Sequence, residues 1–110
     1  MSTSTMFVKV GPYLYLVHFE DMSRVDADGL HYPGKLIIYI DSSEVLRRQQ
    51  AAVMHELLHA VWECVIGRQV AVNEKRTISE EDVVTALAPT LLGVIHDNPE
   101  LLRFLRRGVK

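Results

Sequence analysis

The sequence lacks three features, each of which is typical of a broad class of proteins: paired cysteines, a long apolar run and an excess of charge of one sign. A single cysteine, Cys64, excludes an internal disulfide and is typical of a reducing compartment. No apolar run approaches the roughly 20 residues of a membrane-spanning helix. Residues 1–6 are rich in Ser and Thr and have neither the basic start nor the apolar core of a signal peptide. We therefore expect a cytoplasmic protein with no membrane partner.

The charge balance argues against a nucleic-acid-binding protein, and the length sets the number of domains. Lys and Arg number 12 and Asp and Glu number 14, for a net charge of −2, so the basic surface typical of nucleic-acid binding is missing. A basic cluster at the C-terminus is interpreted as the solvated end of a helix. The 110 residues contain no repeat and no linker, so residues 1–110 are expected to form one domain. We expect a monomer or a weak homodimer.

Gly and Pro are absent from Glu44 to Ile66, which predicts a long helix that ends at Gly67. Ser42 or Ser43 would cap its start. Apolar residues lie around most of this helix, as expected for a central element that is covered on several sides.

Three apolar segments before this helix predict about three strands. Phe7–Val10 and Tyr13–Glu20 flank a Gly11-Pro12 break, and Gly34–Ile40 is rich in β-branched residues. The polar segment Asp21–Pro33 between them is expected to be a loop.

Two further helices are predicted after a polar loop that spans residues 68–77. Ser79 is a strong cap because three acids follow it, and Pro89 should kink or split the helix that it starts. Asn98 and Pro99 open a short last helix. The expected fold class is α+β: a small antiparallel or mixed sheet packed on the long helix, followed by an acid-starting helix and a short C-terminal helix.

The long helix contains the strongest functional signal, the HExxH motif His55-Glu56-Leu57-Leu58-His59. Residues four apart share one face of a helix, so His55 and His59 can bind one zinc ion. Glu56 can take the proton of a water molecule as that water attacks a carbonyl group. A catalytic zinc has three protein ligands, so one more is needed.

Two sources of the third ligand are excluded by spacing. Glu63 lies about 12 Å from His55 along a straight helix, too far for both to reach one ion. The extended motif of the metzincin peptidases needs Gly and His at the positions of Trp62 and Val65. An acid from the next helix remains, and its first turn offers Glu80, Glu81 and Asp82.

Three segments of this chain resemble small gluzincin-type metallopeptidases, close to the ImmA/IrrE-like group of phages and bacteria and to the minigluzincins. They are GKLIIYI (Gly34–Ile40), AVMHELLHAVWE (Ala52–Glu63) and EDVVTALAPTLL (Glu81–Leu92). The resemblance implies that Glu81 is the third zinc ligand, with Glu80 as the alternative. The chain departs from the family at Thr85, where the family has Asn, and at Pro89. If the gene belongs to a phage, the host cytoplasm is the expected location.

The resemblance also implies a zinc-dependent peptidase that cleaves a peptide or protein substrate. Leu36–Ile40 would correspond to the strand that pairs with the extended substrate in this family. An oxyanion stabiliser is also expected. The candidates, which no spacing separates, are Tyr39, Tyr32, His31 and His96.

The alternative function is a latent or non-catalytic zinc-binding protein that acts by binding a protein partner. Minigluzincins are held latent by a terminal segment, and His96–Lys110 could cover the site in the same way. Packing of that segment into the core is the expectation that we favour.

Overall fold

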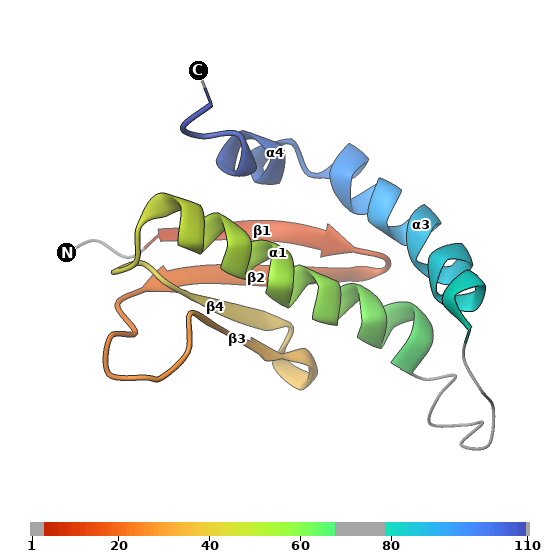
Figure 1. Cartoon of the computed structure of the whole chain (residues 1–110), viewed down its shortest axis with the longest axis horizontal. Coiled ribbons are helices and arrows are strands. Elements are labelled where there is room, and N and C mark those ends of the chain that lie inside the picture. The colour runs from red at the N-terminus through yellow and green to blue at the C-terminus, as the bar shows by residue number, and fades with distance from the viewer. Residues whose placement is uncertain (1–3, 68–78, 110) are drawn as a thin grey trace.

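The computed structural model describes residues 4–67 and 79–109, so the predicted polar loop of residues 68–77 lies outside the described part. The fold class is α+β, as the sequence predicts: a four-stranded mixed sheet carries its helices on one face (Figure 1). The strands are β1 (Ser4–Val10), β2 (Tyr13–Glu20), β3 (Gly29–Tyr32) and β4 (Ile37–Asp41). The main helices are α1 (Leu46–Trp62), α3 (Glu80–Asp97) and α4 (Pro99–Leu105).

The predicted break at Gly11-Pro12 is a two-residue turn between β1 and β2. Val10 pairs with Tyr13 across it, and Gly11 has a φ of 58°. A tight hairpin turn with Gly in its first position needs this positive φ, which side chains other than hydrogen disfavour. Alternate residues of both strands are buried beneath the helices, which is the pattern of a sheet with one covered face.

The strand order is β1-β2-β4-β3, which corrects two expectations from the sequence. The strand Gly29–Tyr32 lies within the predicted loop Asp21–Pro33, so there are four strands and not about three. The expectation for Leu36–Ile40 as the substrate-pairing strand is wrong, because β4 pairs with β2 on one side and with β3 on the other. Among residues 4–67 and 79–109, the outermost strand on this side of the sheet is β3.

The long helix is confirmed, but it starts differently from the expectation. Val45 occupies the N-cap position without a side-chain hydrogen bond, so neither Ser42 nor Ser43 caps it. Ser43 instead donates from its main-chain N–H and from its hydroxyl to Asp41 Oδ1, at 3.0 and 2.6 Å. The helix then widens into a π-helical turn over Glu63–Gly67.

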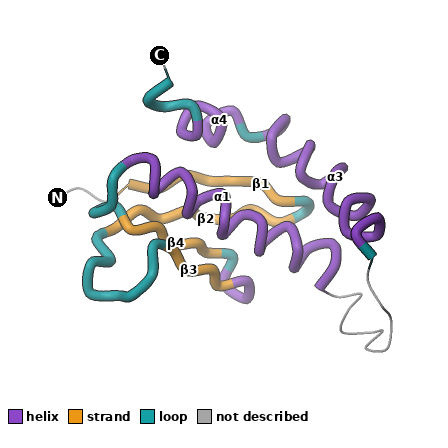
Figure 2. The backbone as a smooth tube through the Cα atoms, viewed as in Figure 1, coloured by secondary structure: helices purple, strands orange, loops and turns teal. Residues whose placement is uncertain are grey.

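The acid-starting helix α3 is confirmed, including its cap. The Ser79 hydroxyl accepts a hydrogen bond from the Asp82 main-chain N–H, and the Asp82 carboxylate accepts one from the Ser79 N–H. The helix runs on through Pro89, so the proline does not split it. Figure 2 shows the helix as one element that ends shortly before α4.

Asn98 precedes α4, which it opens as the sequence predicts, but its side chain makes no cap hydrogen bond. Its amide group instead bonds to the main chain of β1. Asn98 Oδ1 accepts from the Lys9 N–H at 2.8 Å, and Asn98 Nδ2 donates to the Lys9 and Val94 carbonyl oxygens at 2.9 and 2.8 Å. One buried side chain therefore pairs with the outer edge of β1, as a neighbouring strand would.

The core lies between the helical layer and the sheet. It contains the following fully buried large side chains: Ile38, Ile40, Leu57, Leu101, Val8, Val10, Val17, Val53 and Val61. Phe104 of α4 packs against Phe19 with 5.2 Å between ring centroids, so the C-terminal segment completes the core, as favoured above. Within the described residues, the helices are all too short or too polar to cross a membrane.

Candidate metal centre

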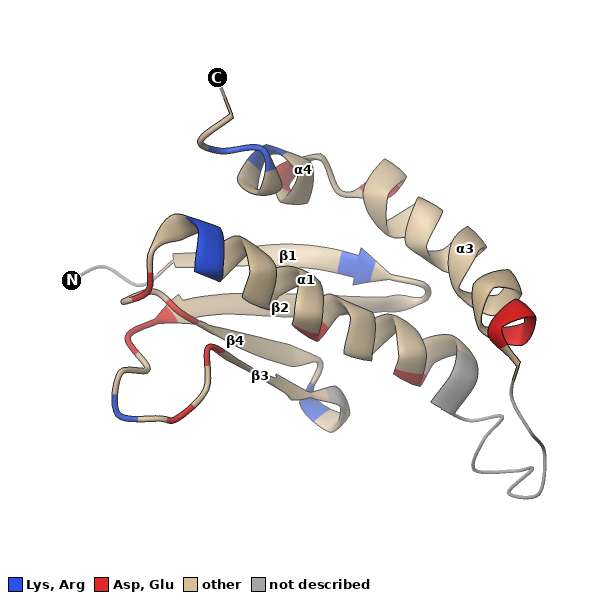
Figure 3. Ribbon diagram, in the orientation of Figure 1, with Lys and Arg blue, Asp and Glu red and all other residues tan. Residues whose placement is uncertain are grey.

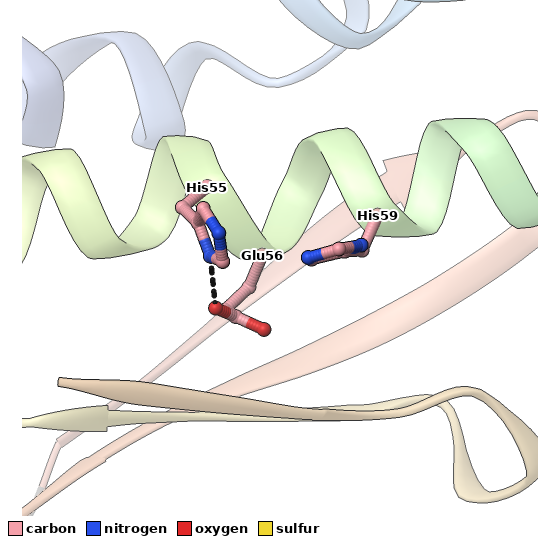
Figure 4. A group of neighbouring side chains, drawn as sticks. All are labelled: His55, Glu56 and His59. Atoms are coloured by element: carbon pink, nitrogen blue, oxygen red, sulfur yellow. Dashed lines mark hydrogen bonds and ion pairs between the residues drawn. The ribbon is translucent and has the colours of Figure 1, made fainter. Parts of the chain in front are cut away.

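The central helix α1 brings together the three functional residues of the HExxH motif. His55, Glu56 and His59 each offer one ligand atom, and these atoms all lie within 4.8 Å of one another. Figure 4 shows that the three side chains project from the side of α1 that faces β3 and β4. The helical repeat accounts for this grouping, because residues one and four apart lie on neighbouring positions of one face.

The two imidazole rings are oriented so that one ion can bind both. Their centroids are 4.8 Å apart and their planes meet at 84°. The lone pair of an imidazole nitrogen lies in the ring plane, so two rings at this angle can direct lone pairs to a common point. The side chain of His55 is 68% exposed and His59 is also exposed, so both rings can rotate to meet an ion without disturbing the core. The group could therefore bind a metal ion.

Glu56 is the buried member of the group, with 6% of its surface exposed. Its carboxylate accepts a hydrogen bond from His55 Nδ1 at 2.5 Å. A buried carboxylate carries a large desolvation cost unless it is hydrogen-bonded or lies beside a positive charge. The hydrogen bond to His55 offsets part of this cost, and a cation between the histidines would offset more.

Gly29 in β3 provides the space that Glu56 occupies. A Cβ atom at Gly29 would lie 3.1 Å from Glu56 Cγ, 3.2 Å from Ile40 Cδ1 and 3.2 Å from the Tyr39 carbonyl oxygen. These distances are shorter than ordinary van der Waals contact, so a side chain at Gly29 would push Glu56 away from the sheet. No pattern in the sequence predicts this role, because Gly29 lies in the polar segment Asp21–Pro33 that favours a loop.

His31 of β3 is a fourth residue beside the group. Its ring stacks on that of His59, with 6.4 Å between centroids and 14° between planes. Its Nε2 atom lies 3.2 Å from the hydroxyl of Tyr15, a buried residue of β2. Of the four candidates for the oxyanion stabiliser, His31 is therefore the one that lies beside the His-Glu-His group.

The other three candidates lie elsewhere. Tyr39 and Tyr32 pack edge to face with each other, and Tyr39 also packs on His18, on the sheet face opposite α1. His96 is exposed on α3 and contacts Asp97. His31 lies beside the group because β3 pairs with β4. The sequence does not reveal this pairing, so it could not separate His31 from the other three candidates.

The surroundings hold both His31 and Tyr15 in their neutral forms at neutral pH. Burial lowers the pKa of His31, and His59 lowers it further, while Glu56 and Glu63 oppose this. Burial and the negative charge of Glu63 raise the pKa of Tyr15. The Tyr15 hydroxyl therefore keeps its hydrogen and can donate it to the neutral imidazole.

A cleft of about 510 Å³ lies next to the group. It is lined by Ala27, Asp28, Gly29, Arg48, Ala51, Ala52, His55 and Glu56. Most of these side chains are small, which leaves room for a ligand group beside Glu56. Arg48 bonds to Asp28 at 2.8 Å, so the cation at the rim of the cleft is already paired.

The predicted third ligand, Glu81, is not part of the group. Glu81 lies in the acidic first turn of α3 and accepts a hydrogen bond from the Thr85 hydroxyl at 3.2 Å. Figure 3 shows this acidic turn at the start of α3, toward the C-terminal end of α1 and away from the side of α1 that faces β3. Glu63 and Glu80 are not part of the group either, among the residues that the structure describes. Glu81 stays a prediction that binding of a metal would test.

Comparison with protein-family models, with curated proteins and with solved structures finds no match to this chain. The fold and the site thus define the class: an α+β protein whose central helix carries a His-Glu-His group that could bind a metal ion.

Proposed function

We propose that the protein is a zinc-dependent metallopeptidase. The observation that carries the proposal is the position of Glu56, a buried acid between two exposed histidines that can share one ion. A zinc ion held by His55 and His59 would polarise the peptide carbonyl group and activate a water molecule. The gluzincin resemblance of the sequence supports zinc over other metals.

Glu56 is the general base in this proposal. Its carboxylate accepts one proton from the water as the water oxygen forms a bond to the carbonyl carbon. Glu56 then gives this proton to the amide nitrogen while the C–N bond breaks, and the second proton of the water passes to the released amine, so the products are a carboxylate and an ammonium group. Gly29 holds Glu56 in place by leaving the room that its side chain needs.

The edge strand β3 supports a peptide as the substrate. β3 is the last strand on its side of the sheet, and His31 on this strand reaches the metal centre. An extended peptide that pairs with this edge would gain main-chain hydrogen bonds and would lie beside Glu56. The cleft next to Glu56 and His55 would then receive a substrate side chain.

A second function, metal binding without hydrolysis, is favoured by one observation. Glu81 lies outside the His-Glu-His group and is hydrogen-bonded to Thr85. A catalytic zinc site needs a third protein ligand, and Glu81 would have to leave Thr85 to provide it. A protein that keeps the metal but binds a partner would need no such completed site.

Zinc content and peptide hydrolysis, measured on matched variants, test both functions. His59→Ala should lose zinc, while His96→Ala, which removes an exposed histidine of α3, should keep it. Glu56→Gln should keep zinc but lose hydrolysis of a mixed-sequence peptide library. Glu100→Gln, the same change at an exposed position of α4, should keep both.

Two results would decide against the peptidase. Equal zinc content in wild type and His59→Ala would remove the metal centre altogether. Zinc binding without any hydrolysis by the wild type would favour the second function.

A further inference from the structure

His31 reaches the candidate metal centre from the sheet and not from the helix that carries the HExxH motif. It is half-buried, stacks on His59 and is held at Nε2 by the buried Tyr15. These contacts hold its ring beside the His-Glu-His group. The question is therefore whether His31 binds the ion itself or acts on the substrate.

Two observations argue against His31 as a metal ligand. It is not among the described residues whose ligand atoms all lie within 4.8 Å of one another, and its ring lies nearly parallel to that of His59. The planes of His31 and His59 are only 14° apart and the rings are stacked, with 6.4 Å between centroids. In-plane lone pairs of two stacked rings point along separate, nearly parallel planes and do not converge on one ion. The pair of His55 and His59, at 84°, has the converging geometry that this pair lacks.

We propose that His31 is a catalytic residue that donates a hydrogen bond to the carbonyl oxygen of the scissile peptide as negative charge develops on it; this inference rests on the proposed peptidase function. Glu56 and His31 then act on different atoms of the same peptide bond. Glu56, from α1, acts on the water and the leaving nitrogen. His31, from β3, acts on the oxygen.

Tyr15 is a positioning residue in this arrangement. In this proposal its hydroxyl, 3.2 Å from His31 Nε2, is the donor of their hydrogen bond, which places the imidazole hydrogen on Nδ1 and leaves that N–H for the substrate. The two rings also pack with 5.5 Å between centroids, so Tyr15 fixes both the tautomer and the angle of His31. A donor that is already oriented stabilises developing charge more than one that must first reorganise.

A binding experiment tests the inference without the need for hydrolysis. The probe is acetohydroxamate, a small chelator whose oxygens bind zinc and carry negative charge where the substrate oxygen would lie. His31→Phe should bind acetohydroxamate roughly tenfold more weakly than the wild type, because it loses a hydrogen bond to a charged group. The zinc dissociation constant should stay within about twofold of the wild type, since a ligand would cost far more. The control, His18→Phe, changes a histidine on the opposite face of the sheet and should alter neither value.

Hydrolysis by the zinc-loaded variants provides the second readout. His31→Phe should lower kcat by roughly 100- to 1,000-fold with little change in KM, as loss of an oxyanion donor does. His31→Gln, which keeps an N–H donor, should recover part of kcat, and Tyr15→Phe should show an intermediate loss. A role in stability alone would not produce the recovery by Gln.

Two outcomes would overturn the inference while the metallopeptidase stands. One is unchanged acetohydroxamate binding and kcat in both His31 variants. The other is a loss of zinc from His31→Phe and His31→Gln, which would make His31 a ligand. A wild-type protein that binds no zinc would instead refute the proposed function, and this inference with it.

Discussion

The side chain of Glu56, the proposed general base, packs against Gly29, the one residue of β3 that has no side chain. A Cβ atom there would meet Glu56 Cγ at 3.1 Å and the Tyr39 carbonyl oxygen at 3.2 Å. The carbonyl oxygen belongs to the backbone of β4 and has little freedom to move. The strain of a larger residue would therefore fall on the flexible Glu56 side chain.

Gly29→Ala should consequently displace Glu56 by a few tenths of an ångström and slow the proposed hydrolysis by up to roughly tenfold, less than the roughly 100-fold effect of a 1 Å misplacement. Zinc binding should be unchanged because His55 and His59 are untouched. Gly34→Ala is the control, as a Cβ there would meet nothing within 4 Å. Equal kcat values for the two variants would show that Gly29 has no part in placing Glu56.

The source of the third ligand is tested on the first turn of α3. If Glu81 binds the ion, it must break its hydrogen bond with Thr85 and approach His55 and His59. Glu81→Ala should then weaken zinc binding by more than the roughly 10- to 100-fold that loss of a supporting residue causes. Zinc affinity can be measured by competition with a chelator of known affinity.

Glu80→Ala is the matched control for Glu81→Ala, because it removes the same charge one position earlier on α3. A larger loss of zinc affinity in Glu80→Ala would assign the ligand to Glu80. Unchanged affinity in both variants would remove α3 as the source of a ligand.

Asn98 should contribute strongly to stability, because its buried amide makes three hydrogen bonds to the main chain of Lys9 and Val94. Asn98→Ala leaves these groups without partners and should lower the free energy of unfolding by about 3 kcal/mol. Urea unfolding should show a lower midpoint with an unchanged slope. Asp97→Ala, at the exposed neighbouring position, should change the midpoint little. A loss below about 1 kcal/mol for Asn98→Ala would mean that water replaces the amide.

Asp41 should make the stability depend on pH in the acid range. Burial by itself would raise the pKa of Asp41, but hydrogen bonds from Ser43 and from the Met22 N–H lower it below its ordinary value of 3.8. The carboxylate therefore stabilises the fold fully above the pKa of the unfolded chain. This contribution is lost as the pH falls through the lower pKa of the folded protein.

Asp41→Asn should remove this part of the pH dependence. It should also lower the free energy of unfolding at neutral pH by about 1–2 kcal/mol, because the hydrogen bonds lose their charged acceptor. Thermal unfolding at several pH values between about 2 and 7 would measure both effects. Parallel curves for Asp41→Asn and wild type would contradict the role of the carboxylate.

The helices could be predicted from the sequence because their signals are local. Ser79 and its acids mark the start of α3, and the absence of Gly and Pro before Gly67 predicts that α1 is long, although Val45 and not a serine precedes it. The strand β3 was missed because four residues among polar neighbours carry too little pattern. The position of β4 inside the sheet depends on its parallel pairing with β2, which is a long-range contact and leaves no local signal.

The same distinction applies to the candidate site. His55, Glu56 and His59 are spaced by the repeat of one helix, so their grouping could be read from the sequence. His31 and Tyr15 come from two strands that β4 separates in the sheet, and no spacing along the chain predicts that they meet. The position of Glu81 relative to the histidines depends on how α3 packs, which the acids of its first turn do not determine.

If the protein is the peptidase proposed above, the shortness of β3 limits which conformational states of a target protein it could cleave. Four residues span roughly 13 Å, and only alternate ones turn their main-chain groups outward, so the edge can hold few residues of a bound peptide. That stretch must arrive already extended and free of its own hydrogen bonds, because so short a ladder cannot unfold a helix or detach a strand. Compact native proteins should therefore resist cleavage, while hinges, chain ends and partly unfolded or damaged proteins should be vulnerable.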